Sequence, residues 1–475
     1  MWICATLSKH KAFESTTHAI ILVFAASVIL RVVPELVAYP YPIGYDVVNY
    51  YIPVTANFET HWPMLIGQFP VYVLILHLVN VFTGLSAHTT VIATATAVFG
   101  LFGVAVFCAA RFLLKLGVKQ CIFVSVFSIF QMAVLRTAWD LHRDVFALAA
   151  MLLAFSLIGR KGTNWKAVAL TFAFAALAAS SDRMVGALFC VTLIAWAAIS
   201  RRKVVVTCAI FSVSIFSLLM VIGYSFSPEA TTTSTAISAH KTPIFYNPQN
   251  LLTYFVVVNG LLCVPAAIGF IRTKHGLILK IPLMASLVGS FSWLVFPELA
   301  QLVADRWIVL AGIFLSIFAG YGILHLVKHL KPRYTVLAAC SVLVLFVVIG
   351  LAYATMSYDE PFILYGLARY NTEEFGPVTM QFNSLDVTDN DKMTSAIAWI
   401  NENTAQDAVI VGEKHWRGFM EVYLQDQRTY RFSSNPQALS AALLEQGRPV
   451  YMIKFDATSP EKFEVDKVEK TALNG

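Results

Sequence analysis

Charged residues are scarce in this sequence. Only 13% of its 475 residues are Asp, Glu, Lys or Arg, whereas 58% are hydrophobic. Soluble domains carry about 25% charged and about 45–50% apolar residues, so the composition excludes an ordinary soluble protein. The sequence also lacks a Gly-rich phosphate loop and an internal repeat, which argues against P-loop chemistry and a repeat array.

Cysteine provides no structural framework either. The seven cysteines include none after Cys340, and no CxxC or Cys/His spacing typical of a zinc site occurs. Most of them lie in apolar runs, which predicts small core residues rather than disulfides. An Asn-x-Ser/Thr sequon is also absent. Together with the lack of cysteine in the C-terminal part, this favours a prokaryotic surface.

Acidic residues are concentrated near the C-terminus. The chain from Tyr358 onward has 18 acidic and 11 basic residues, a net charge of −7. The first 357 residues therefore have 10 acidic and 23 basic residues, a net charge of +13. This division predicts a transmembrane part over 1–357 and a polar domain over 358–475. Because the basic residues are dispersed between apolar runs, nucleic-acid binding is not expected.

Long apolar runs predict about eleven membrane-spanning helices, because a hydrocarbon core of ~30 Å needs about 20 such residues. The first run is too long for a signal peptide and no cleavage site follows it, so we expect it to remain as an anchor. The runs lie near 18–38, 88–110, 120–136, 145–159, 167–181, 184–200, 204–225, 251–271, 277–296, 306–327 and 334–356.

The basic clusters predict the topology. A further apolar stretch, 63–84, is interrupted by Pro70, His77 and Asn80. If it lies along the interface, within a first outer loop over about 39–87, all the basic clusters face the cytoplasm. We therefore expect a cytoplasmic N-terminus and an extracytoplasmic C-terminal domain. The clusters are Lys9/Lys11, Arg111/Lys115/Lys119, Arg160/Lys161/Lys166, Arg201/Arg202/Lys203, Arg272/Lys274/Lys280 and Lys328/Lys331/Arg333.

The C-terminal part has the pattern of a small α/β domain. Asn390 can cap an amphipathic helix, and Asn435-Pro436 can start a second helix that Gly447 closes. Short strands are predicted at 408–412, at 428–432 and in PVYMIKF. Before this domain, the Ser/Thr/Ala-rich segment 226–250 is predicted to be a mobile outer loop.

The first outer loop begins with YPYPIGYDVVNYYIP (39–53), in which one acid, Asp46, stands among tyrosines and prolines. A carboxylate held by a Pro/Gly turn just outside a membrane helix can act as a general base or help to bind a metal. The alternative is an interfacial aromatic belt with a solvated Asp46.

A second cluster is RTAWDLHRDV (136–145). On one continuous helix, Arg136, Asp140, Arg143 and Asp144 share a face and can neutralise one another. A purely structural ion-pair network is one interpretation. However, so many ionisable groups close to a bilayer, including His142, are energetically costly, which favours a functional role. The cluster is therefore either a structural network or part of a site.

Two later outer loops also combine acids with arginines. Asp182-Arg183 occupies a very tight turn, and Arg306 opens a late apolar run. An arginine at such a position can bind phosphate bidentately or extend to the interface without a ligand. In the first helix, Arg31 and Glu35 are four residues apart and predict a structural ion pair.

The arrangement resembles the GT-C superfamily of membrane glycosyltransferases, enzymes that use polyprenyl-phosphate sugars. The similarity consists of the acid of GYDVVNYY soon after the first helix, the interfacial segments, the charged later loops and the outer C-terminal domain. The DRW at 305–307 is similar to a motif of prokaryotic, notably archaeal, members. Two features differ, because Val47 replaces the second acid of the mannosyltransferase-like branch, and the WWD signature is missing, with Trp416-Arg417 nearest to it. Transfer to Asn sequons is therefore not expected.

The resemblance implies an inverting transfer of a hexose or pentose to a glycan, lipid or protein acceptor. Asp46 would deprotonate the acceptor, and Arg306, with Arg183 or Arg143, would stabilise the donor phosphate. The segment 226–250 would order over the donor. No cofactor is certain, and a divalent metal is compatible with the acids. The supporting acids are Asp140, Asp144 and Asp182, and the sugar or acceptor contacts are Tyr45, Tyr50, His142 and His240.

Two other functions compete with this one. In a transporter or flippase for lipid-linked saccharides the same charges would line a path, but they gather at one surface and no pair of broken helices occurs in corresponding halves. A non-catalytic scaffold predicts an exposed and replaceable Asp46.

Overall fold

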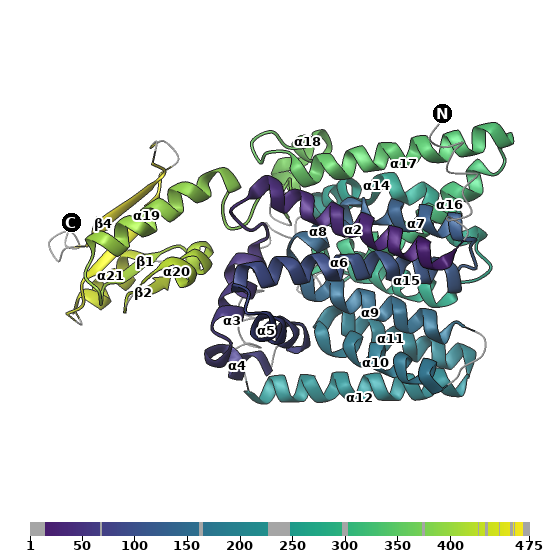
Figure 1. The fold of residues 1–475 in the computed structure, drawn as a ribbon, viewed down its shortest axis with the longest axis horizontal. Coiled ribbons are helices and arrows are strands. Elements are labelled where there is room, and N and C mark those ends of the chain that lie inside the picture. The colour runs from purple at the N-terminus through teal and green to yellow at the C-terminus, as the bar shows by residue number, and fades with distance from the viewer. Residues whose placement is uncertain are drawn as a thin grey trace.

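The computed structural model describes most of the chain, and its long helices lie side by side along one direction (Figure 1). The four strands form a separate unit beyond one end of these helices. The described residues are 15–66, 69–160, 165–226, 248–296, 303–372, 376–425, 427–432, 436–445, 447–456, 459 and 461–468.

Each of the eleven predicted apolar runs forms a helix or a bent pair of helices. Among the described residues, eight helices are long and apolar enough to cross a membrane, and a bent pair, counted as one span, makes a ninth. The chain is a multi-pass membrane protein. The eight are α2 (Thr16–Ala38), α6 (Ala87–Phe112), α11 (Arg183–Ser200), α12 (Lys203–Phe226), α14 (Pro248–Arg272), α15 (Leu277–Phe291) continued by η3 (Ser292–Leu294), α16 (Ala304–Val327) and α17 (Pro332–Thr355). The other two runs form α9 (His142–Ile158) and α10 (Trp165–Ser181), of 17 residues each.

The run predicted at 120–136 is not straight. It forms α7 (Val118–Ile129) and α8 (Met132–Asp140), which meet at 62°. Gln131 between them has an extended backbone (φ −76°, ψ 141°), so the helical hydrogen bonds stop there. The bend leaves the charged end of α8 beside the first turn of α9.

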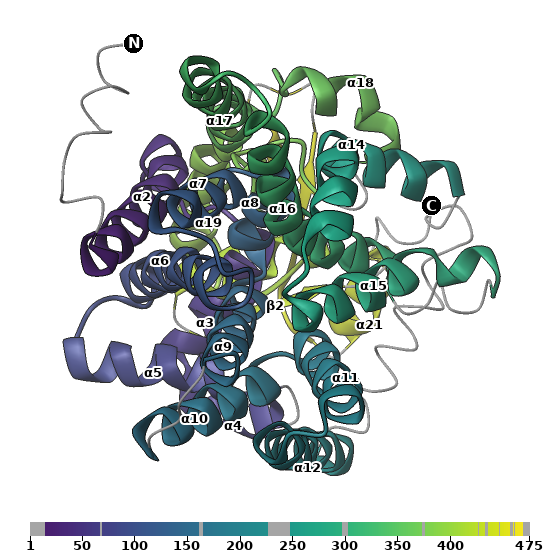
Figure 2. The ribbon, with the colours of Figure 1, turned by 90° about the vertical axis from the view of Figure 1, so that its right-hand side faces the viewer.

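The first outer loop consists of short helices. They are η2 (Val47–Tyr51), α3 (Ile52–Ala56), α4 (Phe58–Ile66) and α5 (Val71–Thr83). The 13 residues of α5 are too few to cross a bilayer. Figure 1 shows α5 end-on, whereas Figure 2 shows its length across the direction of the long helices. The interfacial placement of 63–84 stays a prediction.

The C-terminal part is a small α/β unit with strand order β2-β1-β3-β4. β1 pairs in parallel with β2 and β3, and β3 pairs with β4 in antiparallel fashion. The two predicted helices and three predicted strands are present. β4 was not predicted, although its sequence FEVDK alternates apolar and charged residues as a half-buried strand does. The elements are α18 (Ile363–Thr372), η5 (Val387–Asp389), α19 (Asn390–Asn403), β1 (Val409–Gly412), η6 (Lys414–Trp416), α20 (Arg417–Tyr423), β2 (Thr429–Phe432), α21 (Pro436–Glu445), β3 (Val450–Phe455) and β4 (Phe463–Lys467).

Helices cover both faces of this sheet. Because side chains alternate along a strand, Val409 and Val411 pack against α21, while Ile410 packs on the other face with α19 and α20. The core on the α19 and α20 side also contains Val48 of η2. The first outer loop and the C-terminal unit therefore share one apolar core.

The pair α14 and α16 is packed with its backbones in close contact. A Cβ atom added at Gly269 would come within 1.9 Å of the Phe318 carbonyl oxygen, and one added at Gly322 within 1.9 Å of the Pro265 oxygen. Membrane helices gain stability from such small-residue contacts, because lipid tails give no hydrophobic drive between helices.

We expect Gly322→Ala to destabilise the protein by about 1–3 kcal/mol, since the extra methyl group must force α14 and α16 apart. Thermal unfolding of the detergent-solubilised protein measures the effect. Gly366→Ala in α18, where the nearest atom lies at 3.6 Å, is the matched control and should change the midpoint little. Equal midpoints for the two variants would contradict the packing argument.

Candidate functional site

The turn that carries Asp46 is held between α8 and the C-terminal segment. The Gly44 N–H donates to the Phe382 carbonyl at 2.9 Å. Gly44 has φ +98°, and a Cβ atom there would clash with the Trp139 carbonyl oxygen at 2.4 Å, so only glycine fits. The Asp46 backbone N–H then donates to the Oδ1 atom of Asp140. The acid of the first loop therefore lies directly beside Asp140.

Asp140 is buried and has one cationic neighbour in its own helix. The Nη1 atom of Arg136 lies 3.8 Å from Asp140 Oδ2, and this guanidinium also stacks over the Trp139 ring at 4.8 Å. The expected continuous helical face does not form, because α8 ends at Asp140 and Leu141 (φ −92°, ψ 59°) breaks the helix. Arg143 consequently belongs to α9 and faces a different environment.

Three helices begin next to one another in this region. Asp144 lies in the first turn of α9, and Asp182 caps α11 by accepting from the N–H groups of Met184 at 2.8 Å and Val185 at 2.9 Å. The carboxyl groups of Asp144 and Asp182 contact each other, and both residues are buried. The turn between α10 and α11 is one residue long, as expected. A second pair of acids thus faces the positive ends of helices.

Arg306 is close enough to both pairs of acids to interact with them electrostatically. It lies in the first turn of α16, directly after Asp305. Its charge interacts most strongly with Asp144, then with Asp46 and with the adjacent Asp305, and less with Asp182. The late arginine therefore faces the first-loop acid as well as the acids of α9 and α11.

Arg143 and Arg183 line the side of the cluster next to the first loop. The Arg143 guanidinium lies 5.2 Å from the centre of the Tyr50 ring, and that of Arg183 lies 5.9 Å from the Phe69 ring. Both arginines interact with Asp182. Burial raises the pKa of Tyr50 and the neighbouring Arg143 opposes this effect, so the phenol is protonated and can donate a hydrogen bond.

Tyr45 stands between Asp46 and the C-terminal unit. Burial, followed by the charges of Asp46 and Asp140, raises the pKa of Tyr45 to about 12. Its ring meets the His415 ring edge to face at 5.9 Å. The phenol is protonated at neutral pH and can donate to a sugar or acceptor oxygen.

The two histidines of the expected set have different positions. His142 is buried, with its ring stacked on Tyr51 at 5.1 Å and its Nε2 atom 3.4 Å from Arg31 Nη2. It therefore contacts both the first loop and the first helix. His240 lies outside the described residues, as does most of the segment 226–250.

The ion pair expected in the first helix is present and supports the site. Arg31 Nη1 lies 2.7 Å from Glu35 Oε1, and both side chains are buried. Glu35 Oε2 accepts from the Ile43 N–H at 3.5 Å, while Arg31 Nε donates to the Ala138 carbonyl at 3.1 Å. Through these two hydrogen bonds, the Arg31–Glu35 ion pair holds the segment before Asp46 and the segment before Asp140 close together.

Sequence reasoning missed a second support, which comes from residues 381–383. The Gln381 side-chain amide donates to the carbonyls of Pro34 at 3.1 Å and Ala354 at 2.8 Å. The Asn383 amide donates to the Pro42 carbonyl at 2.8 Å. Nothing in the local sequence distinguishes these two amides from ordinary loop residues, since their partners are far away along the chain.

The acids form pairs rather than a larger metal-binding group. Among the described residues, no group of three or more His, Cys, Asp or Glu side chains is placed to hold a metal ion. The role of Asp140, Asp144 or Asp182 as a metal ligand stays a prediction, and we derive no chemical step through a metal.

Comparisons with solved structures identify the fold. ArnT from Cupriavidus metallidurans bound to undecaprenyl phosphate matches with a TM-score of 0.55 and 12% identity, over 92% of this chain and 93% of that one. The oligosaccharyltransferase of Archaeoglobus fulgidus, in complex with Zn and sulfate, matches with a TM-score of 0.53 and 14% identity, over 92% of this chain and 68% of that one.

Another structure from Archaeoglobus fulgidus, the oligosaccharyltransferase AglB with an inhibitory peptide and a dolichol-phosphate, has a TM-score of 0.52 and 12% identity, over 92% of this chain and 69% of that one. No family model and no curated protein matches the sequence. The structural likenesses show that the chain has the GT-C fold, as its resemblance to that superfamily led us to expect.

The Arg31–Glu35 pair generates a stability prediction. Glu35→Ala leaves a buried guanidinium without its carboxylate and should cost about 3–5 kcal/mol. The double variant Arg31→Met with Glu35→Leu removes both charges and should unfold at a higher temperature than Glu35→Ala alone. Thermal unfolding in detergent measures both, and a double variant less stable than the single one would refute the pairing argument.

Proposed function

We propose that this chain is an integral membrane glycosyltransferase of the inverting type, which moves a sugar from a polyprenyl-phosphate donor to an acceptor at the outer membrane face. One observation carries the proposal: Asp46 lies beside Asp140 and in the field of Arg306, where three helices begin. The polyprenyl phosphates bound to ArnT and to AglB support a donor of this kind.

Asp46 has the position required of the general base. It is partly exposed, whereas Asp140 is 5% exposed and accepts the N–H of Asp46. The Asp46 carboxylate takes the proton of the acceptor hydroxyl. The acceptor oxygen forms a bond to the anomeric carbon while the bond from that carbon to the phosphate oxygen breaks. The bond electrons leave with the polyprenyl phosphate, and the configuration at the anomeric carbon inverts.

Arg306 has the charge and position to stabilise the leaving phosphate. Preorganised cations lower the barrier most where negative charge develops, and the start of α16 adds the positive end of a helix dipole. Arg143 and Arg183 extend the positive surface at the starts of α9 and α11.

The proposed orientation follows from the charge distribution. The first loop and the C-terminal unit lie at one end of the helices (Figure 1), where the acids of the site are also found. The basic connections after α6, α9, α11, α14 and α16 then face the cytoplasm. Sugar transfer takes place on the opposite, extracytoplasmic side, at the level of the outer leaflet of the cell membrane.

The base assignment is tested by Asp46→Asn. We expect at least a 100-fold loss of sugar transfer with unchanged donor binding, because general-base catalysis contributes about 10²–10⁴-fold. The assay follows radiolabelled sugar from native polyprenyl-phosphate donors into membrane acceptors. Glu59→Gln, an exposed acid of the same loop, is the control and should keep wild-type activity. Full activity of Asp46→Asn would eliminate this assignment.

The phosphate assignment is tested by Arg306→Ala. Loss of the cation should lower the rate of transfer by about 10²–10³-fold and weaken the binding of polyprenyl phosphate as a product inhibitor. Arg306→Lys should recover part of the rate, since the charge returns without the bidentate geometry. Arg201→Ala is the matched control, because Arg201 lies at the C-terminal end of α11, away from the helix starts that form the site. An Arg306→Ala variant with normal inhibition by polyprenyl phosphate would contradict the assignment.

A further inference from the structure

A groove in the membrane part lies outside the cluster around Asp46. A cavity of about 710 Å³ is formed between α2 and α6, two helices that are long and apolar enough to cross a membrane. Figure 2 shows them as neighbours at the edge of the helix bundle. Ala93 and Ala97 of α6 line the cavity and are exposed, so it is a groove that opens sideways toward the hydrocarbon of the bilayer.

The groove is closed at one end and has the depth of one leaflet. A Cβ atom added at Gly100 would come within 2.6 Å of the Phe24 ring, and one added at Gly103 within 2.1 Å of Ser27 Oγ, so α2 and α6 are in contact there. The lining extends along α2 from Phe24 to Glu35, a rise of about 16 Å. One leaflet accounts for about 15 Å of the ~30 Å hydrocarbon core. The groove therefore fits the chain of a lipid from one leaflet.

The chemistry of the lining differs from that of the cluster proposed to hold the donor phosphate. The walls are mostly apolar and include Val28 and Val32 from α2 and Ile92 from α6. Glu35 is the one acidic residue of the described lining, which contains no Lys or Arg. In a polyprenyl-phosphate sugar the chain is attached directly to the phosphate, so the donor chain has to begin beside cations such as Arg306. The groove is therefore suited to a lipid other than the donor.

The open end of the groove adjoins the segment that leads to Asp46. Tyr41 lines this end, and its hydroxyl donates to Asp391 Oδ1 in α19 at 2.7 Å. Glu35 Oε2, in the wall of the groove, accepts from the Ile43 N–H at 3.5 Å. The wall of the groove and the segment before Asp46 are thus joined by a hydrogen bond. A lipid head group at this opening would lie against that segment.

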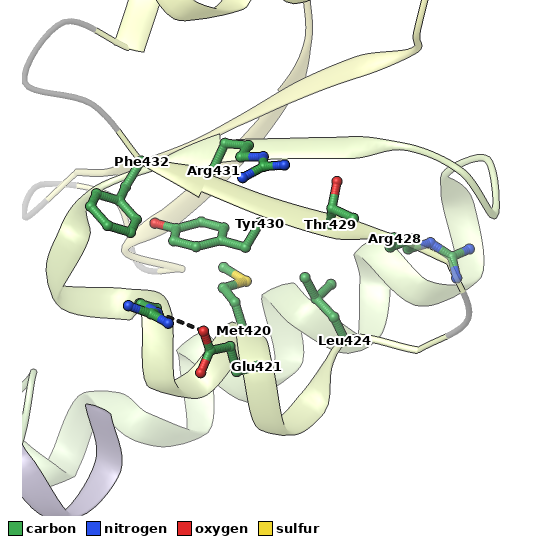
Figure 3. Close-up of a pocket in the computed structure, with 9 residues that line it drawn as sticks. Met420, Glu421, Leu424, Arg428, Thr429, Tyr430, Arg431 and Phe432 are labelled. Atoms are coloured by element: carbon green, nitrogen blue, oxygen red, sulfur yellow. Dashed lines mark hydrogen bonds and ion pairs between the residues drawn. The ribbon is translucent and has the colours of Figure 1, made fainter. Parts of the chain in front are cut away.

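The cavity of the C-terminal unit is less suited to an acceptor. It lies between α20 and β2 (Figure 3), and its charged groups are bound within the protein. Arg417 Nε lies 2.5 Å from Glu421 Oε1, and Arg428 donates to the Asn401 carbonyl at 2.7 Å. A polar acceptor would have to displace these contacts, whereas the groove between α2 and α6 offers apolar surface to a chain without displacing any.

We propose that the groove between α2 and α6 binds the hydrocarbon chain of the acceptor, a lipid of the outer leaflet with a hydroxyl group in its head group. The head group extends past Tyr41, which brings its hydroxyl to Asp46. Because a bilayer gives no hydrophobic drive for this binding, the chain is held by close packing in the groove. This proposal rests on the glycosyltransferase function proposed above and adds to it the chemical class of the acceptor.

The experiment uses the full chain in phosphatidylcholine vesicles with a radiolabelled polyprenyl-phosphate sugar and increasing amounts of lipid extract from native membranes. The lipids are then treated with mild acid, which cleaves the sugar–phosphate bond of unused donor but leaves a glycosidic bond intact. We expect acid-stable label in the lipids that rises with the amount of extract and saturates. The water-soluble and protein fractions of the same membranes are tested as acceptors in parallel.

Ala93→Phe fills the groove and should raise the half-saturating amount of lipid extract about tenfold, the equivalent of about 1.4 kcal/mol. Ala97→Phe, one turn deeper, is a second variant with the same expected effect. Half-saturation by the donor should not change, which also shows that each variant is folded. Ala267→Phe is the matched control and should saturate like wild type, because Ala267 is exposed on α14, across the bundle from α2 and α6 (Figure 2).

The two proposals fail in different ways. If wild-type protein labels only the water-soluble or the protein fraction, or if both groove variants saturate with the same amount of lipid extract as wild type, the acceptor groove is overturned while the glycosyltransferase stands. A rise in the half-saturating amount of donor instead would assign the groove to the donor chain and overturn it as well. If wild-type protein transfers sugar to no fraction, the proposed function itself fails.

Discussion

A charged pair buried in the first membrane helix is the constraint on which the site depends. Arg31 and Glu35 lie 2.7 Å apart, and a bilayer offers no water to satisfy their remaining donors and acceptors. They obtain these partners from Ile43 and Ala138. The need to satisfy one ion pair therefore holds two distant segments together, and the two carboxylates that follow these segments, Asp46 and Asp140, become neighbours.

The second pair of acids is stabilised in a different way. Asp182 uses its carboxylate to cap α11, and Asp144 lies in the first turn of α9, so both face the partial positive charges of helix starts. Arg306 adds a full positive charge between this pair and Asp46. A leaving phosphate would meet helix dipoles and a guanidinium that are fixed before it arrives, which is the condition for electrostatic catalysis.

The sequence predicts the helices well because the membrane makes apolar length a strict requirement. It also selects Asp46, Asp182 and Arg306 as candidates, since charges at helix ends stand out against apolar runs. The runs 120–136 and 145–159 predicted a connection between two helices, but the exact break at Leu141 was not predicted, because RTAWDLHRDV has neither proline nor glycine to show where one helix ends. The supports at Gln381 and Asn383 were missed because they act through contacts more than 300 residues away along the chain.

The charge boundary near Tyr358 separates the membrane part from the polar C-terminal part. The two parts nevertheless pack against each other. Val48, two residues after Asp46, belongs to the apolar core of the C-terminal unit together with Trp416 and Phe419, and Gly418 is in backbone contact with it. A movement of α20 is therefore transmitted to η2, since closely packed backbones leave little room for independent shifts. The position of the first-loop acid therefore depends on the packing of α20 in the C-terminal unit.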